Sequence, residues 1–549
     1  MILERLKAWA IRSRIADLYK FSRSVRSNER KLKDYLLWLR SYRITHDIRD
    51  DSDSSRILAE MDVQWADTPH VMRQWLKLVL LDRIRQWLKL TPIARIRRIP
   101  GVTSISSFFI RHLNSLTDVM RAQLRVEYFY SFGRKAAFDL LTHHGDLRGA
   151  IEAFKQLRKI SAPPEHKRDH HFMVKLLPVV AEMEERLAEE VPRETSANGP
   201  PRLVISLVVW GERYLMLFED YCLPSLRAAG NLNDLGETEV HWHIFTTEAD
   251  RRHMAESGCQ KALEKIGPVR FEAIPKKLAA LAKGQNRYWL YGAVMQLSFR
   301  FAARLDADVH FMNPDTVYSR NFFRGTLEAA AREGAQIMLK NSIRTQLESV
   351  CKALDAAKDD AGRLDLTAEA LASLGLKHVH PASRIGFVTP EQIRDGPLPN
   401  VSFLVWRDES TLVIHSPHHQ PILVRRDLLS PDMRLSYHTV DSVILRQWSG
   451  KRDVNVYVTK AEDKMNYFEI SPRELPTPQL VKRDEFIRSF WKQNGLDEYG
   501  LFSRELRLPL DGPEDLEDVL CSQARDCARE FARLLSELHD HRPKSQDTR

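Results

Sequence analysis

Carboxylates stand at both ends of a short apolar run in the middle of the sequence. Asp306 and Asp308 precede the run 309–312, and Asp315 follows it in Asn-Pro-Asp. Closely spaced carboxylates suit a hard divalent cation, Mn²⁺ or Mg²⁺, that is bound to phosphate. In an open α/β sheet, ligands bind where the strands end. Asp306, Asp308 and Asp315 are therefore the candidate metal ligands.

A helix must lead into this run. Apolar residues recur every three or four positions before it and then become continuous, which predicts a helix ending near Leu305 and a strand over 309–312. The periodic positions are Leu290, Val294, Leu297, Phe301 and Leu305.

Further strands alternate with helices around this unit. β-branched and apolar runs at 204–209, 240–245, 269–274 and 335–339 are separated by helical stretches. Such alternation predicts an α/β domain with a doubly wound, mainly parallel sheet. The sequence contains neither GxGxxG after the first strand nor GxxxxGK[ST] anywhere, which argues against dinucleotide-binding and P-loop proteins. Carboxylates that hold a metal ion are another means of neutralising phosphate.

From about residue 200 to 470 the sequence resembles GT-A type nucleotide-sugar glycosyltransferases. The resemblance rests on LDADVHFMNPD, with its DxD, and on strands that end in Trp210-Gly211 and Thr246-Thr247. It implies that the acidic residues hold Mn²⁺ or Mg²⁺ on the donor diphosphate, and that the ends of the two strands bind the donor.

The chain departs from the family pattern at the motif itself. The DxD of the family follows a strand, whereas Asp306 and Asp308 precede the predicted one. By topology, Asp315 would then occupy the position of the metal-binding acid, with Asn313 in place of the first acid. Alternatively, Asp306 is a loop residue after a helix and Asp315 belongs to an ordinary turn, because Asn-Pro-Asp favours turns. The sequence leaves open whether Asp306 and Asp308, or Asn313 and Asp315, hold the metal ion.

Two helices are expected over 346–374, and beyond residue 375 the chain becomes rich in strands and histidines, starting with 376–381. Two further roles fall in this region. The resemblance implies a C-terminal histidine as a metal ligand or phosphate contact, and His418 and His419, between two predicted strands, are the first choices. Asp441, which precedes a predicted helix, is the candidate catalytic base. The alternatives are surface histidines and a helix-capping carboxylate.

The domain organisation follows from changes in composition. We expect a basic helical region over 1–190, a polar linker rich in Pro and Gly over 191–201, a GT-A-like α/β domain over 202–470, and a helical extension with a polar tail over 471–549. Residues 136–157 read as a helical hairpin with Gly145 at its turn.

Positive charge is concentrated at the N-terminus. Residues 1–100 hold 22 Lys and Arg against 12 Asp and Glu, while the whole chain has a formal net charge of +9. An apolar stripe edged with Lys and Arg over 72–89 is typical of a helix that lies on an anionic membrane surface, and equally of a helix packed in a bundle. We expect no nucleic-acid partner.

The remaining features indicate a cytoplasmic protein, with peripheral binding at the inner face of the membrane as an option. The composition, 43% hydrophobic and 29% charged, is that of a globular protein, and no apolar run is long enough to cross a bilayer. The N-terminus lacks a secretory signal. The five cysteines show no CxxC spacing, which argues against zinc sites and disulfide frameworks.

The sequence thus predicts a metal-dependent glycosyltransferase that moves a sugar, hexosyl or related, from a nucleotide-sugar donor to an acceptor. The alternative is a non-catalytic scaffold in which a degenerate α/β domain and the helical N-terminus serve binding. The sequence specifies neither the donor sugar, the acceptor nor the stereochemical course.

Overall fold

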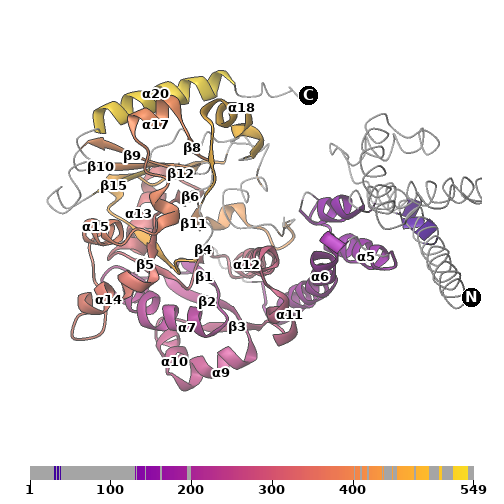
Figure 1. The fold of residues 1–549 in the computed structure, drawn as a ribbon. Helices are drawn as coiled ribbons and strands as arrows, with labels where there is room; N and C mark the ends of the chain where they lie inside the picture. Colours follow the sequence, from indigo (N-terminus) through magenta and orange to yellow (C-terminus); the bar gives the residue numbers. More distant parts are fainter. Residues whose placement is uncertain are drawn as a thin grey trace, which may run out of the picture. The chain divides into compact units, whose positions relative to one another are not determined.

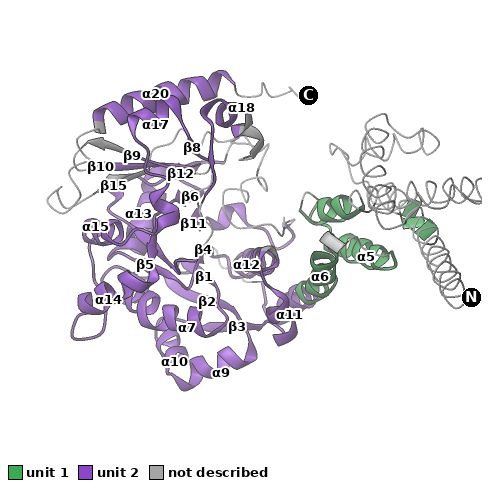
Figure 2. Cartoon of the chain, in the orientation of Figure 1, with its two compact units in different colours: residues 1–181 green, residues 182–549 purple. Residues whose placement is uncertain are grey.

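A computed structural model divides the chain into two compact units, residues 1–181 and residues 182–549 (Figure 2). The residues that it describes are 27, 30–31, 34–35, 37–38, 130, 133–142, 144–160, 164–193, 199–400, 402–408, 411–416, 420–433, 435, 437, 448, 454–474, 478–493, 506–509 and 524–541. The predicted stripe at 72–89 and most of the basic segment 1–100 lie outside these residues.

The described part of the first unit is helical. Residues 133–142 form one helix, and α5 (Leu147–Arg158) follows after a turn in which Gly145 has a φ of 59°. The carboxylate of Asp146 begins α5 by accepting a hydrogen bond from the Gly149 amide. The helical hairpin predicted at 136–157 is therefore present. The long helix α6 (Pro164–Glu190) crosses the boundary between the units, so its last turns belong to the second.

The second unit is built on a seven-stranded sheet in the order β12-β6-β11-β4-β1-β2-β3 (Figure 1). All neighbours are parallel except β11, which is antiparallel to both β4 and β6. The predicted α/β class with a mainly parallel sheet is confirmed. The strands are β1 (Arg202–Val208), β2 (Glu239–Thr246), β3 (Val269–Ala273), β4 (Asp308–Met312), β6 (Ile337–Lys340), β11 (Gln420–Val424) and β12 (Val456–Val458).

Helices cover both faces of this sheet. On one face α12 (Gln285–Leu305) packs on β1, β4 and β2, where Phe299 meets Phe311 edge to face. The opposite face buries a large apolar cluster that includes Leu203, Leu207 and Trp242. Its helical segments are α7 (Glu212–Leu217), the π-helical turn η2 (Phe218–Cys222), α8 (Leu223–Leu226), α9 (Glu248–Glu256), α10 (Cys259–Glu264) and α13 (Phe322–Glu333).

The helix and strand predicted around the acidic motif are present. Helix α12 ends at Leu305, because Asp306 adopts a left-handed conformation with a φ of 50°. The chain then enters β4, whose five residues are all buried. Its apolar character suits a central strand that is covered on both faces.

Smaller sheets accompany the main one. In one of them β13 (Tyr467–Ser471) lies between β5 (Thr316–Tyr318) and β7 (Arg344–Gln346). In another, β10 (Thr411–His415) lies between β9 (Phe403–Asp408) and β15 (Leu506–Pro509). A two-stranded sheet pairs β8 (Leu398–Pro399) with β14 (Leu480–Val481).

Two helices occupy the region predicted to be helical after residue 346, namely α14 (Leu347–Ala357) and α15 (Ala368–Lys377). The strand-like segment at 376–381 is not a strand. Helix α15 continues to Lys377 because Ala372 and Leu376 extend its buried face. Within the described residues, Val379 forms an isolated bridge with Thr345 and no strand.

The C-terminal extension packs on the same unit. Helices α18 (Arg483–Gln493) and α20 (Ala524–Asp540) share a buried apolar cluster with residues 388–405, a stretch that contains α17 (Pro390–Asp395). The remaining short elements are α11 (Lys276–Leu281), α16 (Pro381–Arg384), η3 (Arg426–Leu428) and η5 (Ala461–Asp463). None of the described helices combines the length and apolarity that crossing a bilayer requires.

Candidate functional site

The order of the strands marks one position on the sheet. From β1 the chain proceeds outward through β2 to β3, and then returns to place β4 on the other side of β1. Ligands of open α/β sheets bind at such a reversal, outside the carboxyl ends of the strands. Trp210 and Gly211 follow β1, and Asn313 and Asp315 follow β4, so both loops lie at this reversal.

Two carboxylates meet there. The β5–β13 pairing sets Thr316 opposite Glu469, and the carbonyl of Asp315 accepts a hydrogen bond from the Ile470 amide at 2.7 Å. Burial, and secondly the negative charge of Glu469, raise the pKa of the Asp315 carboxyl to about 7. The positive charge of Arg344 opposes this rise without cancelling it. The two acids thus repel each other even though Arg344 is close to them.

Glu469 is fixed by a polar network. Its Oε1 accepts hydrogen bonds from Asn313 Nδ2 at 3.1 Å and from Gln420 Nε2 at 2.8 Å. Its Oε2 pairs with Arg344 Nε at 3.2 Å. The hydroxyl of Tyr291 donates to Asn313 Oδ1, which orients the amide. Side chains from α12, β7, β11 and the loop after β4 therefore fix the position of this carboxylate.

Cationic and aromatic side chains lie close to the acids. The Arg287 guanidinium stands 5.0 Å from the ring centroid of Tyr288 and donates to its hydroxyl at 3.1 Å. The Tyr288 side chain is 45% exposed. Burial and then the charge of Asp315 raise the pKa of Tyr214, whose ring lies 5.5 Å from Arg213. An arginine beside an exposed tyrosine ring suits a ligand that carries both phosphate and a planar group.

The residues predicted to bind the donor are partly brought together. Asp250 Oδ2 accepts hydrogen bonds from the Gly211 amide at 3.1 Å and from Thr247 Oγ1 at 2.7 Å, which ties the ends of β1 and β2. Gly211 has a φ of 87°, a conformation that disfavours any side chain. Thr246 is buried, and its Oγ1 has no hydrogen-bond partner among the residues that the structure describes. Trp210 is half-buried.

Asp306 and Asp308 lie at the amino end of β4, away from Asp315. The Asp308 carboxylate accepts a hydrogen bond from the Arg426 amide at 2.9 Å and pairs with Arg425 at 3.4 Å. Asp306 pairs with Arg426 Nη1 at 3.1 Å. The three acids of the motif therefore do not form one group.

Three of the predicted site residues, His418, His419 and Asp441, lie outside the described residues. Among the residues that the structure does describe, no group of three or more His, Cys, Asp or Glu side chains is arranged to hold a metal ion. Any metal site built from the described side chains would thus rest on a pair of acids.

Sequence reasoning missed Glu469, Arg344 and the tyrosine-rich start of α12. Glu469 and Asp315 are far apart in the sequence, and the small β5–β13–β7 sheet joins them. A local signal did exist for α12, since Arg287, Tyr288 and Tyr291 are concentrated in RYWLY at the amino end of a helix.

Comparisons with known proteins find only limited similarity, and only to solved structures. No protein-family model and no curated protein matches the chain. Among solved structures it is similar to apo mouse xyloside xylosyltransferase 1, with 14% identity, 26% of this chain and 53% of that chain covered, and a TM-score of 0.18. It is also similar to S. aureus TarS, with 10% identity, 62% of this chain and 43% of that chain covered, and a TM-score of 0.22. The chain thus spans about half of each of these structures.

Proposed function

We propose that the second unit transfers a sugar from a nucleotide-sugar donor in a reaction that depends on a divalent metal ion. The observation that supports this best is the pair Asp315 and Glu469 at the reversal point of the sheet. Its position is the one where an α/β sheet binds phosphorylated ligands, and the sequence there resembles GT-A glycosyltransferases.

The residues present fit Mn²⁺ or Mg²⁺. Asp315 and Glu469 repel each other although Arg344 pairs with Glu469, and a divalent ion at Asp315 would relieve that repulsion. Mg²⁺ is commonly held by one or two carboxylates together with substrate phosphates, so a third protein ligand is not required. When bound, such an ion stabilises negative charge on the departing nucleoside diphosphate.

We therefore assign the metal to Asp315, with Glu469 beside it, and regard Asp306 and Asp308 as partners of Arg425 and Arg426 in holding the amino end of β4. Further contact of the metal or phosphate with His418 or His419, and proton removal from the acceptor by Asp441, stay predictions.

The remaining side chains have matching roles. In this proposal Arg287 pairs with phosphate, and the exposed ring of Tyr288 packs against a planar base or sugar. Gly211 leaves room for a ligand to approach the backbone, since no heavy atom of the other described residues, its two chain neighbours aside, lies within 4 Å of the position that a Cβ would take there.

Calorimetric titration of the full chain with uridine and guanosine diphosphates, with Mn²⁺ and with chelator, tests this function. We expect binding only with metal, and loss of binding in Asp315→Asn. The control is Asp306→Asn, which neutralises a partly exposed acid at the opposite edge and keeps a residue type that tolerates the left-handed backbone there. It should bind like the wild type.

Equal affinity in chelator, or full binding by Asp315→Asn, would contradict the proposal and favour the non-catalytic scaffold. Loss of binding in Asp306→Asn, with retention in Asp315→Asn, would instead assign the metal to the amino-end pair.

A further inference from the structure

Strand β3 is the last strand of the main sheet, and its outer edge is unpaired among the described residues. On the inner edge, the carbonyl of Pro268 and the amide of Ile274 both bond to β2. Because backbone groups alternate in direction along a strand, the even-numbered residues face β2. The amides and carbonyls of Val269, Phe271 and Ala273 therefore point outward.

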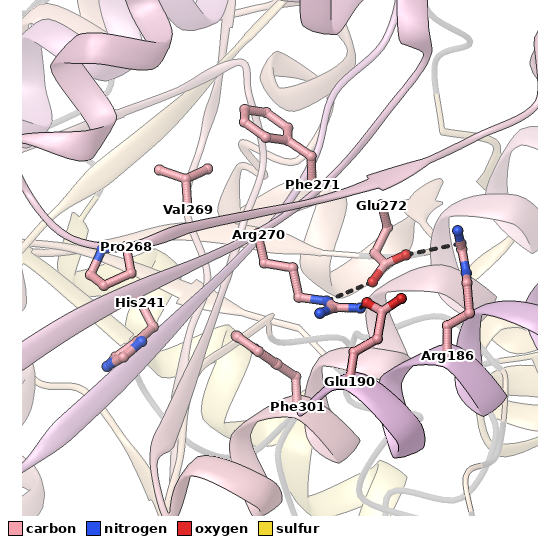
Figure 3. A pocket seen from close by; sticks show the side chains of 9 residues that line it. All are labelled: Arg186, Glu190, His241, Pro268, Val269, Arg270, Phe271, Glu272 and Phe301. Atoms are coloured by element: carbon pink, nitrogen blue, oxygen red, sulfur yellow. Dashed lines mark hydrogen bonds and ion pairs between the residues drawn. The ribbon is translucent and has the colours of Figure 1, made fainter. Parts of the chain in front are cut away.

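A cavity borders this strand (Figure 3). It measures about 430 Å³ and is lined by residues 268–272, by Arg186 and Glu190 from the end of α6, and by His241 of β2 and Phe301 of α12. Because α12 packs on one face of the sheet, the cavity lies on that face, beside β3. The charged side chains Arg270 and Glu272 therefore border an open space and not a packed core.

The sequence of β3 is complementary to itself. It reads Val-Arg-Phe-Glu-Ala, with Arg270 and Glu272 on either side of Phe271. In an antiparallel pair centred on Phe271, Arg270 of one copy lies opposite Glu272 of the other, and the reverse pair forms by symmetry. Opposite charges at directly opposed positions are favourable.

The direction of the backbone groups agrees with the same register. Antiparallel strands exchange hydrogen bonds at alternate residue pairs. In the register centred on Phe271 these are the pairs 271 with 271, and 269 with 273, which are the residues whose amides and carbonyls point outward. The charged pairs 270 with 272 then occupy the positions where opposed side chains are closest.

We propose that β3 is a dimerisation edge: a second copy of this chain adds its own β3 antiparallel to the first, centred on Phe271, so that one sheet continues through both copies. This interface is independent of the proposed catalytic site, which lies at the carboxyl ends of β1 and β4.

The charges on and beside β3 favour this occupant. Glu272 is 2% exposed and already pairs with Arg270 at 2.7 Å and Arg186 at 3.1 Å, and Arg270 also reaches Glu190 at 2.8 Å. Charged residues of one sign on an edge strand repel a second copy and prevent pairing. Here the two signs alternate, so a second copy extends the existing network of ion pairs.

A substitution that removes the backbone amide of residue 273 tests whether β3 pairs with a second copy. Ala273 is exposed and its amide points outward, so Ala273→Pro removes a hydrogen bond of the interface and leaves the ladder with β2 intact. Light scattering and sedimentation of the full chain should show a dimer for the wild type and for the control Ala273→Thr, which keeps the amide. We expect Ala273→Pro to weaken dimerisation about 10- to 100-fold at an unchanged melting temperature.

Cysteine pairing tests the register independently. Val269 of one copy and Ala273 of the other form a pair with Cα atoms about 5.5 Å apart, within reach of a disulfide. Identical residues at these positions are displaced by four steps, about 13 Å along the strands. A mixture of Val269→Cys and Ala273→Cys chains should therefore cross-link on mild oxidation, and neither variant alone should do so, with the wild-type chain as the control for its native cysteines.

A monomeric wild-type chain at every concentration would overturn the proposal. So would cross-linking of Ala273→Cys alone as readily as of the mixture, or a dimer that Ala273→Pro leaves unchanged in affinity.

Discussion

The Asp315 carboxyl is placed where its charge disfavours folding in the absence of a ligand. Its pKa is about 7 in the folded chain, against an ordinary value of 3.8. The unfolded chain therefore loses this proton at lower pH. The cost to stability is absent below pH 3.8, grows as the pH rises, and is complete above pH 7.

Replacing this residue should accordingly stabilise the protein while removing its function. In chelator at pH 8, we expect Asp315→Asn to raise the free energy of unfolding by roughly 1–3 kcal/mol. This is less than the full shift would give at about 1.4 kcal/mol per pKa unit, because Asp315 as a residue is only half-buried. At pH 4 the gain should vanish. Urea unfolding at the two pH values measures it, and a variant that is less stable than the wild type at pH 8 would refute this view of Asp315.

Lys340 is a second buried ionisable group, at the carboxyl end of β6. It is 1% exposed, and burial lowers the pKa of its amine from 10.5 to about 7. The unfolded chain binds the proton more tightly than the folded chain, so the charged lysine destabilises the fold fully below pH 7 and not at all above pH 10.5.

Lys340→Met nearly keeps the volume and removes the charge. We expect it to stabilise the protein by about 2–4 kcal/mol at pH 6 and by much less at pH 10. Thermal unfolding at both pH values shows the difference, and Lys277→Met, at an exposed lysine, is the control without pH-dependent gain. A gain that is equal at the two pH values would mean that packing, rather than charge, limits stability at this position.

These residues differ in whether their importance can be predicted from the sequence. Asp315 is accessible to sequence reasoning because it closely follows an apolar strand, within a single local pattern. Glu469 is not, since its importance comes from a strand pairing over a long sequence separation. Lys340 reads as the polar end of a strand, and its burial depends on segments that cover it from elsewhere in the chain.

At the scale of elements, the local periodicity of the sequence predicts where helices and strands begin and end. It does not predict which strands pair with each other. The change from a 3.6-residue period to a continuous apolar run correctly places the end of α12 at Leu305, and β4 begins at Asp308, one residue before the predicted strand. The position of β11 is not accessible in this way. Its run Pro-Ile-Leu-Val predicts a strand, yet nothing local states that it enters the main sheet antiparallel, between β4 and β6.

The last turns of α6 belong to the second unit and form polar contacts with it. Glu184 accepts hydrogen bonds from Arg300 Nε and from the Tyr437 hydroxyl, both at 2.9 Å, and Arg186 pairs with the buried carboxylate of Glu272. In the sequence, α6 reads as the last helix of the N-terminal region. In the structure, its end contacts α12 and β3.

A chain starting at Glu182 should therefore be more stable than one starting at Pro201. Removing this segment leaves Glu272 without Arg186 and breaks several partly exposed ion pairs, which we expect to cost about 1–3 kcal/mol. Urea denaturation of the two chains gives the difference. Coincident transitions would show that the end of α6 contributes nothing to the stability of this unit.

For the molecule as a whole, the apolar cluster at the C-terminus decides where a functional fragment ends. The ring of Phe403 lies 5.4 Å from those of Phe486 and Phe531, so β9 depends on helices α18 and α20, which follow it far along the chain. The polar, charged appearance of residues 471–549 conceals this contribution, because in an amphipathic helix such as α20 only one face carries the apolar residues.

Truncation after Pro472 should consequently damage the second unit even though it keeps both Asp315 and Glu469. It would uncover the buried side chains Val388, Ile393 and Phe403 as parts of one apolar patch, which favours aggregation. We expect residues 182–541 to be soluble, to unfold cooperatively and to bind nucleoside diphosphate, and residues 182–472 to be insoluble. Soluble, cooperatively folded 182–472 with the same nucleotide affinity would show instead that α18 and α20 are an appendage, and that the boundary near residue 470 is a true domain boundary.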